Sequence, residues 1–176
     1  RSPQHPEGLG GASKVLGRYL MDHIRVVAGG HGAPLVPEAG VNELGRIVFL
    51  PRFDARNTGT VNDRGFGVQM VRLPREGGGS IFMAASYGEM LPNEQNHVVL
   101  HPSRRDAWGI PVLHIDSAHT ARDRQRAQEQ ADALRELIDA LGVTLTMIED
   151  RASAPGSANH ECGTARTVEG AAGDHL

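Results

Sequence analysis

TARDRQRAQEQADALRELIDALG, residues 120–142, is the stretch that decides the fold, because it carries the clearest helical period in the chain. Small and apolar side chains recur on one stripe, and Arg, Asp, Glu and Gln fill the other positions. Thr120 is placed to cap the helix, Asp123 follows three residues later as a short-acid capping box, and Gly142 is placed to end it. The pattern predicts a helix over 121–141 that packs through Ala127, Ala131, Leu134, Ile138 and Leu141.

The segments before and after this helix are rich in β-branched and aromatic residues and are bounded by Gly, Pro or Asn. The sequence between two of these segments, Gly77-Gly78-Gly79, favours a hairpin turn over a phosphate-binding loop. Short separations along the chain favour antiparallel pairing. The expected fold class is therefore α+β, an antiparallel sheet of about five or six strands backed by helices. The expected strands are 46–53, 65–73, 80–86, 97–101, 111–116 and, further on, 144–148.

A second, shorter helix is predicted over 13–23. Ser13 is a suitable N-cap, and apolar residues follow at helical spacings. His23 would then lie at the helix end, where it can interact with the last carbonyls and the helix dipole. We expect the helix over 121–141 to back the sheet and to hold the segment around His160 through the strand at 144–148.

Composition fits one folded domain and excludes several classes of protein. The chain has 176 residues, of which 39% are hydrophobic and 22% charged. The net charge of −3 gives no electrostatic footprint for nucleic acid, and no apolar run is long enough to cross a membrane. The single cysteine, Cys162, cannot form an internal disulfide, which favours a reducing, cytoplasmic location.

The segment Pro155-Gly156-Ser157-Ala158-Asn159-His160-Glu161-Cys162-Gly163-Thr164-Ala165-Arg166 presents a histidine on an irregular, glycine-bounded stretch. Glycine takes backbone angles that other residues avoid, and loops on a rigid scaffold are where catalytic residues usually lie. A histidine in such a loop is more often structural than catalytic. His160 is nevertheless the candidate catalytic residue, and the adjacent Cys162 is a weaker candidate nucleophile.

The string from His160 to Arg166 resembles the HxxGTxRMG segment of the glucose-methanol-choline (GMC) flavin oxidoreductases. Other segments in the same order are similar to that family. Residues 16–23, LGRYLMDH, resemble its VGRxLMDH helix, and residues 2–10 resemble the loop before that helix. Residues 89–100 and 106–112, EMLPNEQNHVVL and DAWGIPV, resemble a passage of its substrate domain.

The resemblance implies a GMC substrate-binding-like domain over 1–166 and a divergent tail over 167–176. The glycine-rich turn that binds the FAD pyrophosphate is not recognisable, because residues 8–11 and 65–70 lack the third glycine at its spacing. The resemblance still implies FAD as the cofactor. Because the turn is not recognisable here, FAD is expected to be held largely by segments absent from this chain. A second chain carrying the FAD-binding domain could supply them.

The resemblance also implies roles for the residues around His160. The family histidine stands over the flavin and takes the proton of the substrate hydroxyl, so His160 is expected to be the base. Asn159 and Glu161 flank it and are expected to orient the imidazole or to contact the substrate. The expected substrate is a small-molecule alcohol or polyol of the sugar type. Aromatic residues at 4% indicate no wide stacking platform for a sugar ring, although the sheet could supply polar contacts.

Two other functions remain open from the sequence. The chain could be a non-catalytic binding module or subunit that partners a separate flavoprotein chain. It could also be a metal-dependent enzyme that uses His114, Asp116 and His119, since the first two would share one face of a strand. No fourth ligand at a recognisable spacing accompanies these three residues.

Overall fold

The computed structural model describes residues 2–6, 8, 10–34, 46–52, 65–149 and 151–165, and the chain divides into two compact units. Unit 1 combines residues 1–22, 91–118 and 159–176, and unit 2 combines residues 23–90 and 119–158. Phe53, Arg166 and the predicted tail 167–176 lie outside the described residues.

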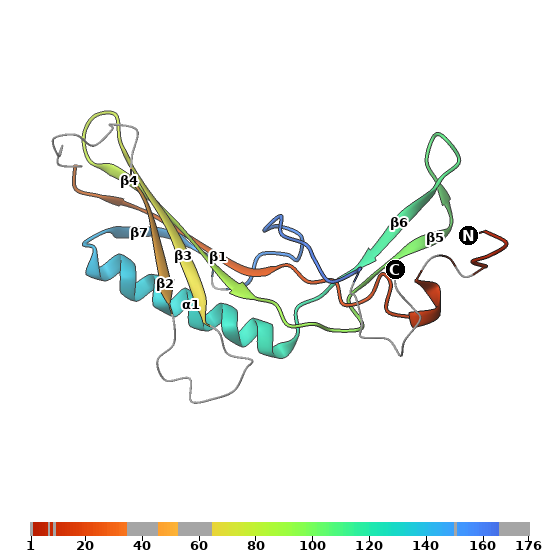
Figure 1. The fold of residues 1–176 in the computed structure, drawn as a ribbon. Coiled ribbons are helices and arrows are strands. Elements are labelled where there is room, and N and C mark those ends of the chain that lie inside the picture. The colour runs from red at the N-terminus through yellow and green to blue at the C-terminus, as the bar shows by residue number, and fades with distance from the viewer. Residues whose placement is uncertain are drawn as a thin grey trace. The chain divides into compact units, whose positions relative to one another are not determined.

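The described residues of unit 2 form a five-stranded antiparallel sheet with one helix on one face (Figure 1). The strand order is β2-β3-β4-β1-β7. The α+β class is confirmed, and so is the hairpin at Gly77-Gly78-Gly79, where Gly78 N donates to the Arg75 carbonyl. The elements are β1 (His23–Gly32), β2 (Arg46–Arg52), β3 (Phe66–Pro74), β4 (Ser80–Glu89), α1 (Ala121–Ala140) and β7 (Thr144–Ile148).

The helix α1 begins and packs as its sequence predicts. Asp123 N donates to Thr120 Oγ1 over 3.1 Å, and Thr120 N donates to Asp123 Oδ2 over 2.8 Å, so the capping box is complete. Leu141, predicted on the buried stripe, lies past the helix end and is exposed. The other four predicted stripe residues are buried in one core with β1 and β4 side chains, namely Ile24, Val26, Ala28, Phe82 and Ala84.

The strand β1 was not predicted, although it is central to the sheet. Its sequence, HIRVVAGGHG, ends in glycines that are unusual inside a strand. These glycines allow close approach, because a Cβ atom at Gly30 would overlap the Thr144 carbonyl of β7. The β1–β7 register also shifts between Gly29 and Gly30. A tertiary contact thus explains glycines that weaken the strand signal in the sequence.

The helix predicted over 13–23 is wrong. A short 3-10 turn, η1 (Gly11–Ser13), is followed by extended chain in which Gly17 and Tyr19 have positive φ values of 82° and 60°. The backbone pairs with distant residues instead, since Leu20 N donates to the Asn96 carbonyl over 3.0 Å. His23 is therefore the first residue of β1 and does not lie at a helix end. Its ring is edge-on to that of Tyr87, and its Nδ1 lies 3.3 Å from the Gly88 carbonyl oxygen.

Unit 1 contains a two-stranded antiparallel ribbon of β5 (His97–Arg105) and β6 (Pro111–Asp116). Both strands were predicted, but they form a sheet of their own. The segment around Gly17 and Arg18 pairs along β5, with Val98 N donating to the Gly17 carbonyl over 2.6 Å. Among the described residues, no helix combines the length and apolar character needed to cross a bilayer.

Candidate active site

His160 lies on an extended segment of unit 1, where it is exposed together with Asn159, Glu161 and Cys162. Asn159 has a φ of 60°, a left-handed angle that asparagine tolerates better than most residues. The turn at Asn159 comes directly before His160, and the backbone pairs with Met21 from Cys162 onward. The three residues predicted for the site are consecutive and all accessible, as a proton-transfer group and its neighbours must be.

The segment after His160 is clamped against residues 17–21. Met21 and Cys162 exchange two backbone hydrogen bonds, each of 2.9 Å, and Gly17 N donates to the Thr164 carbonyl over 2.7 Å. Gly163 lies between these contacts with φ at 96°, and a Cβ atom there would overlap the Tyr19 carbonyl. The glycine at this position is therefore required by both its backbone angle and the close approach of the neighbouring chain.

Asp22 binds the backbone of His160 directly. His160 N donates to Asp22 Oδ1 over 3.3 Å, and Asp22 is only 7% exposed. A buried carboxylate that accepts a backbone N–H fixes the local path of the chain. Asp22 was not predicted as a site residue. The signal that could have found it is its place in the string Leu20-Met21-Asp22-His23, which resembles a family motif.

A second buried polar residue, Asn96, binds the same segment 17–21 that pairs with Cys162 and Thr164, a pairing called here the clamp. Its carbonyl accepts from Leu20 N over 3.0 Å. Its side chain binds the Ala118 backbone twice, accepting from the amide over 3.0 Å and donating to the carbonyl over 3.2 Å. Asn96 therefore joins residues 1–22 of unit 1 to both ends of the segment 91–118.

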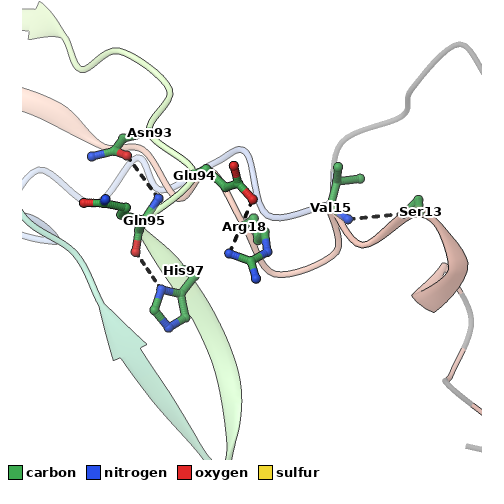
Figure 2. Close-up of polar contacts among 7 residues, drawn as sticks. All are labelled: Ser13, Val15, Arg18, Asn93, Glu94, Gln95 and His97. Carbon is green, nitrogen blue, oxygen red and sulfur yellow. Dashed lines mark hydrogen bonds and ion pairs between the residues drawn. The ribbon is translucent and has the colours of Figure 1, made fainter.

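Polar contacts of the turn before β5 are drawn in Figure 2. Gln95 N donates to Asn93 Oδ1 over 3.0 Å, and His97 Nδ1 lies 2.6 Å from the Gln95 carbonyl oxygen. Arg18 makes an exposed ion pair with Glu94 at 3.7 Å. Exposed pairs of this kind contribute little to stability, so the backbone bonds and Asn96 hold the clamp.

The predicted support of the His160 segment needs correction. We expected α1 and β7 to hold it, but both belong to unit 2, whereas the segment from Asn159 onward belongs to unit 1. The backbone bonds that fix Cys162 and Thr164 come from residues 17–21. Cys162 and Thr164 lie about 140 residues from Met21 and Gly17 in the sequence, so a local pattern could not predict that these residues pair.

The three residues of the metal-dependent alternative, His114, Asp116 and His119, do not form a group that could hold a metal ion. His114 and Asp116 are exposed on β6 in unit 1, and His119 belongs to unit 2. The rings of His101 and His114 are edge-on, with 6.1 Å between their centroids. Within the described ranges, no three His, Cys, Asp or Glu side chains are grouped so that they could hold a metal ion.

The N-terminus of α1 is already capped and does not fit the pyrophosphate of FAD, the cofactor that the sequence resemblance implies. A flavin pyrophosphate is usually held at a helix N-terminus by free backbone N–H groups. The only helix longer than one turn in the described part of the chain is α1, and the Asp123 carboxylate already occupies its N-terminus. A second anion there would be repelled, so this chain's own α1 does not fit the pyrophosphate of FAD.

The face of the unit 2 sheet opposite α1 offers polar side chains at its centre. Arg25 of β1 and Tyr87 of β4 are cross-strand partners on this face, and Gln69 of β3 lies beside Ala85. Cross-strand partners share a face and lie close enough to act on one molecule. That the sheet supplies polar contacts to a substrate stays a prediction.

No family model matches this chain. Over 167 aligned positions the chain is 29% identical to the 2-methyl-1,2-propanediol dehydrogenase of Mycolicibacterium austroafricanum. The match covers 81% of this chain and 30% of that dehydrogenase, so the chain spans less than a third of the length of this relative. The chain is thus similar to part of an oxidoreductase that is named for its action on a diol.

Proposed function

We propose that this chain is the substrate-binding portion of an alcohol or polyol oxidoreductase, in which His160 is the base that takes the hydroxyl proton. The observation that carries the proposal is the placement of His160. Its imidazole is exposed, while its backbone is bound by the buried Asp22 and followed by the clamp at Met21 and Cys162. The similarity to a diol dehydrogenase supports the same chemistry.

The chemistry follows from the needs of alcohol oxidation. A carbon gives up hydride readily only while its hydroxyl is becoming an alkoxide, so a base must lie within hydrogen-bond reach of that hydroxyl. Imidazole exchanges protons near neutral pH, and its charged form stabilises the developing alkoxide. A fixed backbone beneath an accessible side chain lets the ring reach the substrate without a large loss of conformational freedom.

Asn159 and Glu161 are proposed to orient this imidazole or to contact the substrate. Both flank His160 and are exposed, as substrate contacts require. The substrate class is a small alcohol or polyol, and 2-methyl-1,2-propanediol is the first compound to test because the relative is named for it.

The cofactor belongs to this proposal as well. We propose GMC-type chemistry with FAD as the hydride acceptor, bound largely by segments outside this chain. The exposed free thiol of Cys162 fits a reducing compartment and hence a cytoplasmic location. The alternative of a non-catalytic module that partners a separate flavoprotein differs in one respect, because it gives His160 no role in proton transfer.

The test is steady-state turnover of the full gene product that contains this chain, with 2-methyl-1,2-propanediol and other polyols as substrates. His160→Ala is expected to lower kcat by roughly 10²–10⁴-fold, the usual contribution of a general base. Flavin content should be unchanged, because the His160 side chain is not proposed to hold the cofactor.

His5→Ala is the matched control, since His5 is another exposed histidine of unit 1. It should leave kcat within about twofold of the wild type. Equal turnover of the His160→Ala and His5→Ala proteins would reject the role of His160 and leave the non-catalytic module as the better account. A gene product that contains no flavin would reject the cofactor assignment.

A further inference from the structure

The clamp pairs Cys162 and Thr164 with residues 17–21, and His160 lies just before it in the chain. At His160 the partner changes from backbone to side chain, because the backbone N–H of His160 donates to Asp22 Oδ1 over 3.3 Å. Asp22 directly follows Met21, which exchanges two backbone bonds with Cys162. The Asp22 carboxylate therefore extends the hold of this segment to the residue that carries the imidazole.

The bond between Asp22 and His160 lies within unit 1. It joins the last residue of the stretch 1–22 to the beginning of the stretch 159–176, so its geometry does not depend on where unit 2 lies. Asp22 is buried, which keeps water from replacing the N–H as its partner. Hydrogen bonds to an ionised acceptor are also stronger than those between neutral groups.

The backbone conformation before His160 needs a contact of this kind. Asn159 has a φ of 60°, and for residues with a side chain the left-handed region persists only where surrounding contacts impose it. The N–H that Asp22 binds belongs to the planar peptide group between Asn159 and His160. The bond thus fixes the orientation of that peptide plane. If the plane turned, the Cα atom of His160 and its imidazole would move with it.

We propose that Asp22 is a positioning residue for the base His160, and that it acts through the peptide group of His160. The inference rests on the proposed function for the reaction that His160 performs. A general base must lie within hydrogen-bond reach of the proton that it takes, and a misplacement of about 1 Å can cost about 10²-fold in rate. The role needs an acceptor oxygen at this place, because the bonded group is a neutral N–H.

The first test is the rate of cofactor reduction in a single turnover of the full gene product that contains this chain, at several concentrations of 2-methyl-1,2-propanediol. Asp22→Ala should slow reduction by about 10–100-fold and change the half-saturating concentration by less than about threefold. Asp22→Asn keeps an oxygen that can accept from the His160 N–H and should stay within about fivefold of the wild-type rate. An Asp22→Asn protein as slow as the Asp22→Ala protein would contradict a role that needs only the acceptor.

Asp106→Ala is the matched control for a general loosening of unit 1. Asp106 is another aspartate of this unit whose carboxylate accepts backbone N–H bonds, from Trp108 and Ile110, each over 2.9 Å. These bonds lie within the turn between β5 and β6, so their loss should leave the rate within about twofold of the wild type. Equal slowing of the Asp22→Ala and Asp106→Ala proteins would assign Asp22 to stability alone and overturn the proposal.

A double variant tests whether Asp22 acts through His160. In a protein that already carries His160→Ala, adding Asp22→Ala should change the remaining rate by less than about twofold, because no base is left to position. A further loss as large as the one in the wild-type background would show that Asp22 acts on another part of the site. That result would also overturn the proposal.

Amide hydrogen exchange tests the bond without turnover. Asp22→Ala should raise exchange of the His160 amide by at least about tenfold, while the Met21 and Cys162 amides stay within about threefold of the wild type. If the Asp22→Ala protein does not fold, Asp22→Ser takes its place, since serine keeps a polar atom but is one atom shorter. Unchanged exchange of the His160 amide would show that Asp22 does not hold it and would remove the proposal.

The same rates separate this inference from the proposed function. A slow His160→Ala protein beside an Asp22→Ala protein of wild-type rate would overturn the positioning role and keep His160 as the base. Wild-type rates in both proteins would reject the proposed function, and the positioning role with it.

Discussion

At the scale of single residues, the path of the His160 segment is set by backbone conformation and by one buried carboxylate. Asn159 and Gly163 both have left-handed φ angles, and between them the backbone is bound to Asp22 and Met21. The sequence indicated His160 and its glycine, because irregular composition is visible locally. Composition did not indicate Asp22, because its carboxylate binds a backbone amide 138 residues away; only its place in a string that resembles a family motif marks it.

The requirement for glycine at position 163 gives a residue-scale prediction. Gly163→Ala should raise hydrogen exchange of the Met21 and Cys162 amides at least about tenfold, because the new Cβ atom would overlap the Tyr19 carbonyl and force the clamp apart. Gly109→Ala is the control. Gly109 also has a positive φ, 77°, but a Cβ atom there meets nothing within 4 Å. Equal exchange of the Met21 and Cys162 amides in the two variants would show that a side chain at position 163 does not disturb the clamp, and would contradict the prediction.

At the scale of elements, the same helical spacing gave a correct prediction at α1 and a wrong one at residues 13–23. The α1 sequence has a full capping box, 20 helical residues and a stripe of alanines that lets it approach the sheet. The N-terminal segment has a glycine at its centre, and its backbone donors pair with Asn96, Cys162 and Thr164. A helical spacing of apolar residues predicts a helix only where no distant segment of the chain pairs with the same backbone groups.

The capping box gives the prediction at this scale. Thr120→Ala removes the oxygen that accepts from Asp123 N and should lower the free energy of unfolding of unit 2 by about 0.5–2 kcal/mol. Thr120→Ser keeps that oxygen and should lose less. Urea unfolding followed by far-ultraviolet circular dichroism measures both values. A Thr120→Ser protein as unstable as the Thr120→Ala protein would mean that the lost methyl group, and not the cap, matters.

At the scale of the whole molecule, the apolar core and the candidate site belong to different units. The core lies in unit 2, between α1 and the five-stranded sheet, whereas His160, Asp22 and the ribbon of β5 and β6 lie in unit 1. The α+β class was predictable because α1 and the strands of unit 2 other than β1 carry strong local signals. The division into units was not, because unit 1 is assembled from three separate stretches of chain whose contacts join residues far apart in the sequence.

The rate of cofactor reduction in a single turnover tests most directly whether His160 takes the hydroxyl proton. The full gene product is mixed with 2-methyl-1,2-propanediol without oxygen, and the absorbance of the cofactor is followed. His160→Ala should slow this reduction by about 10²–10⁴-fold, and added imidazole should restore part of the rate, since a free base can enter the space left by the side chain. Reduction at the wild-type rate in the His160→Ala protein would contradict the account.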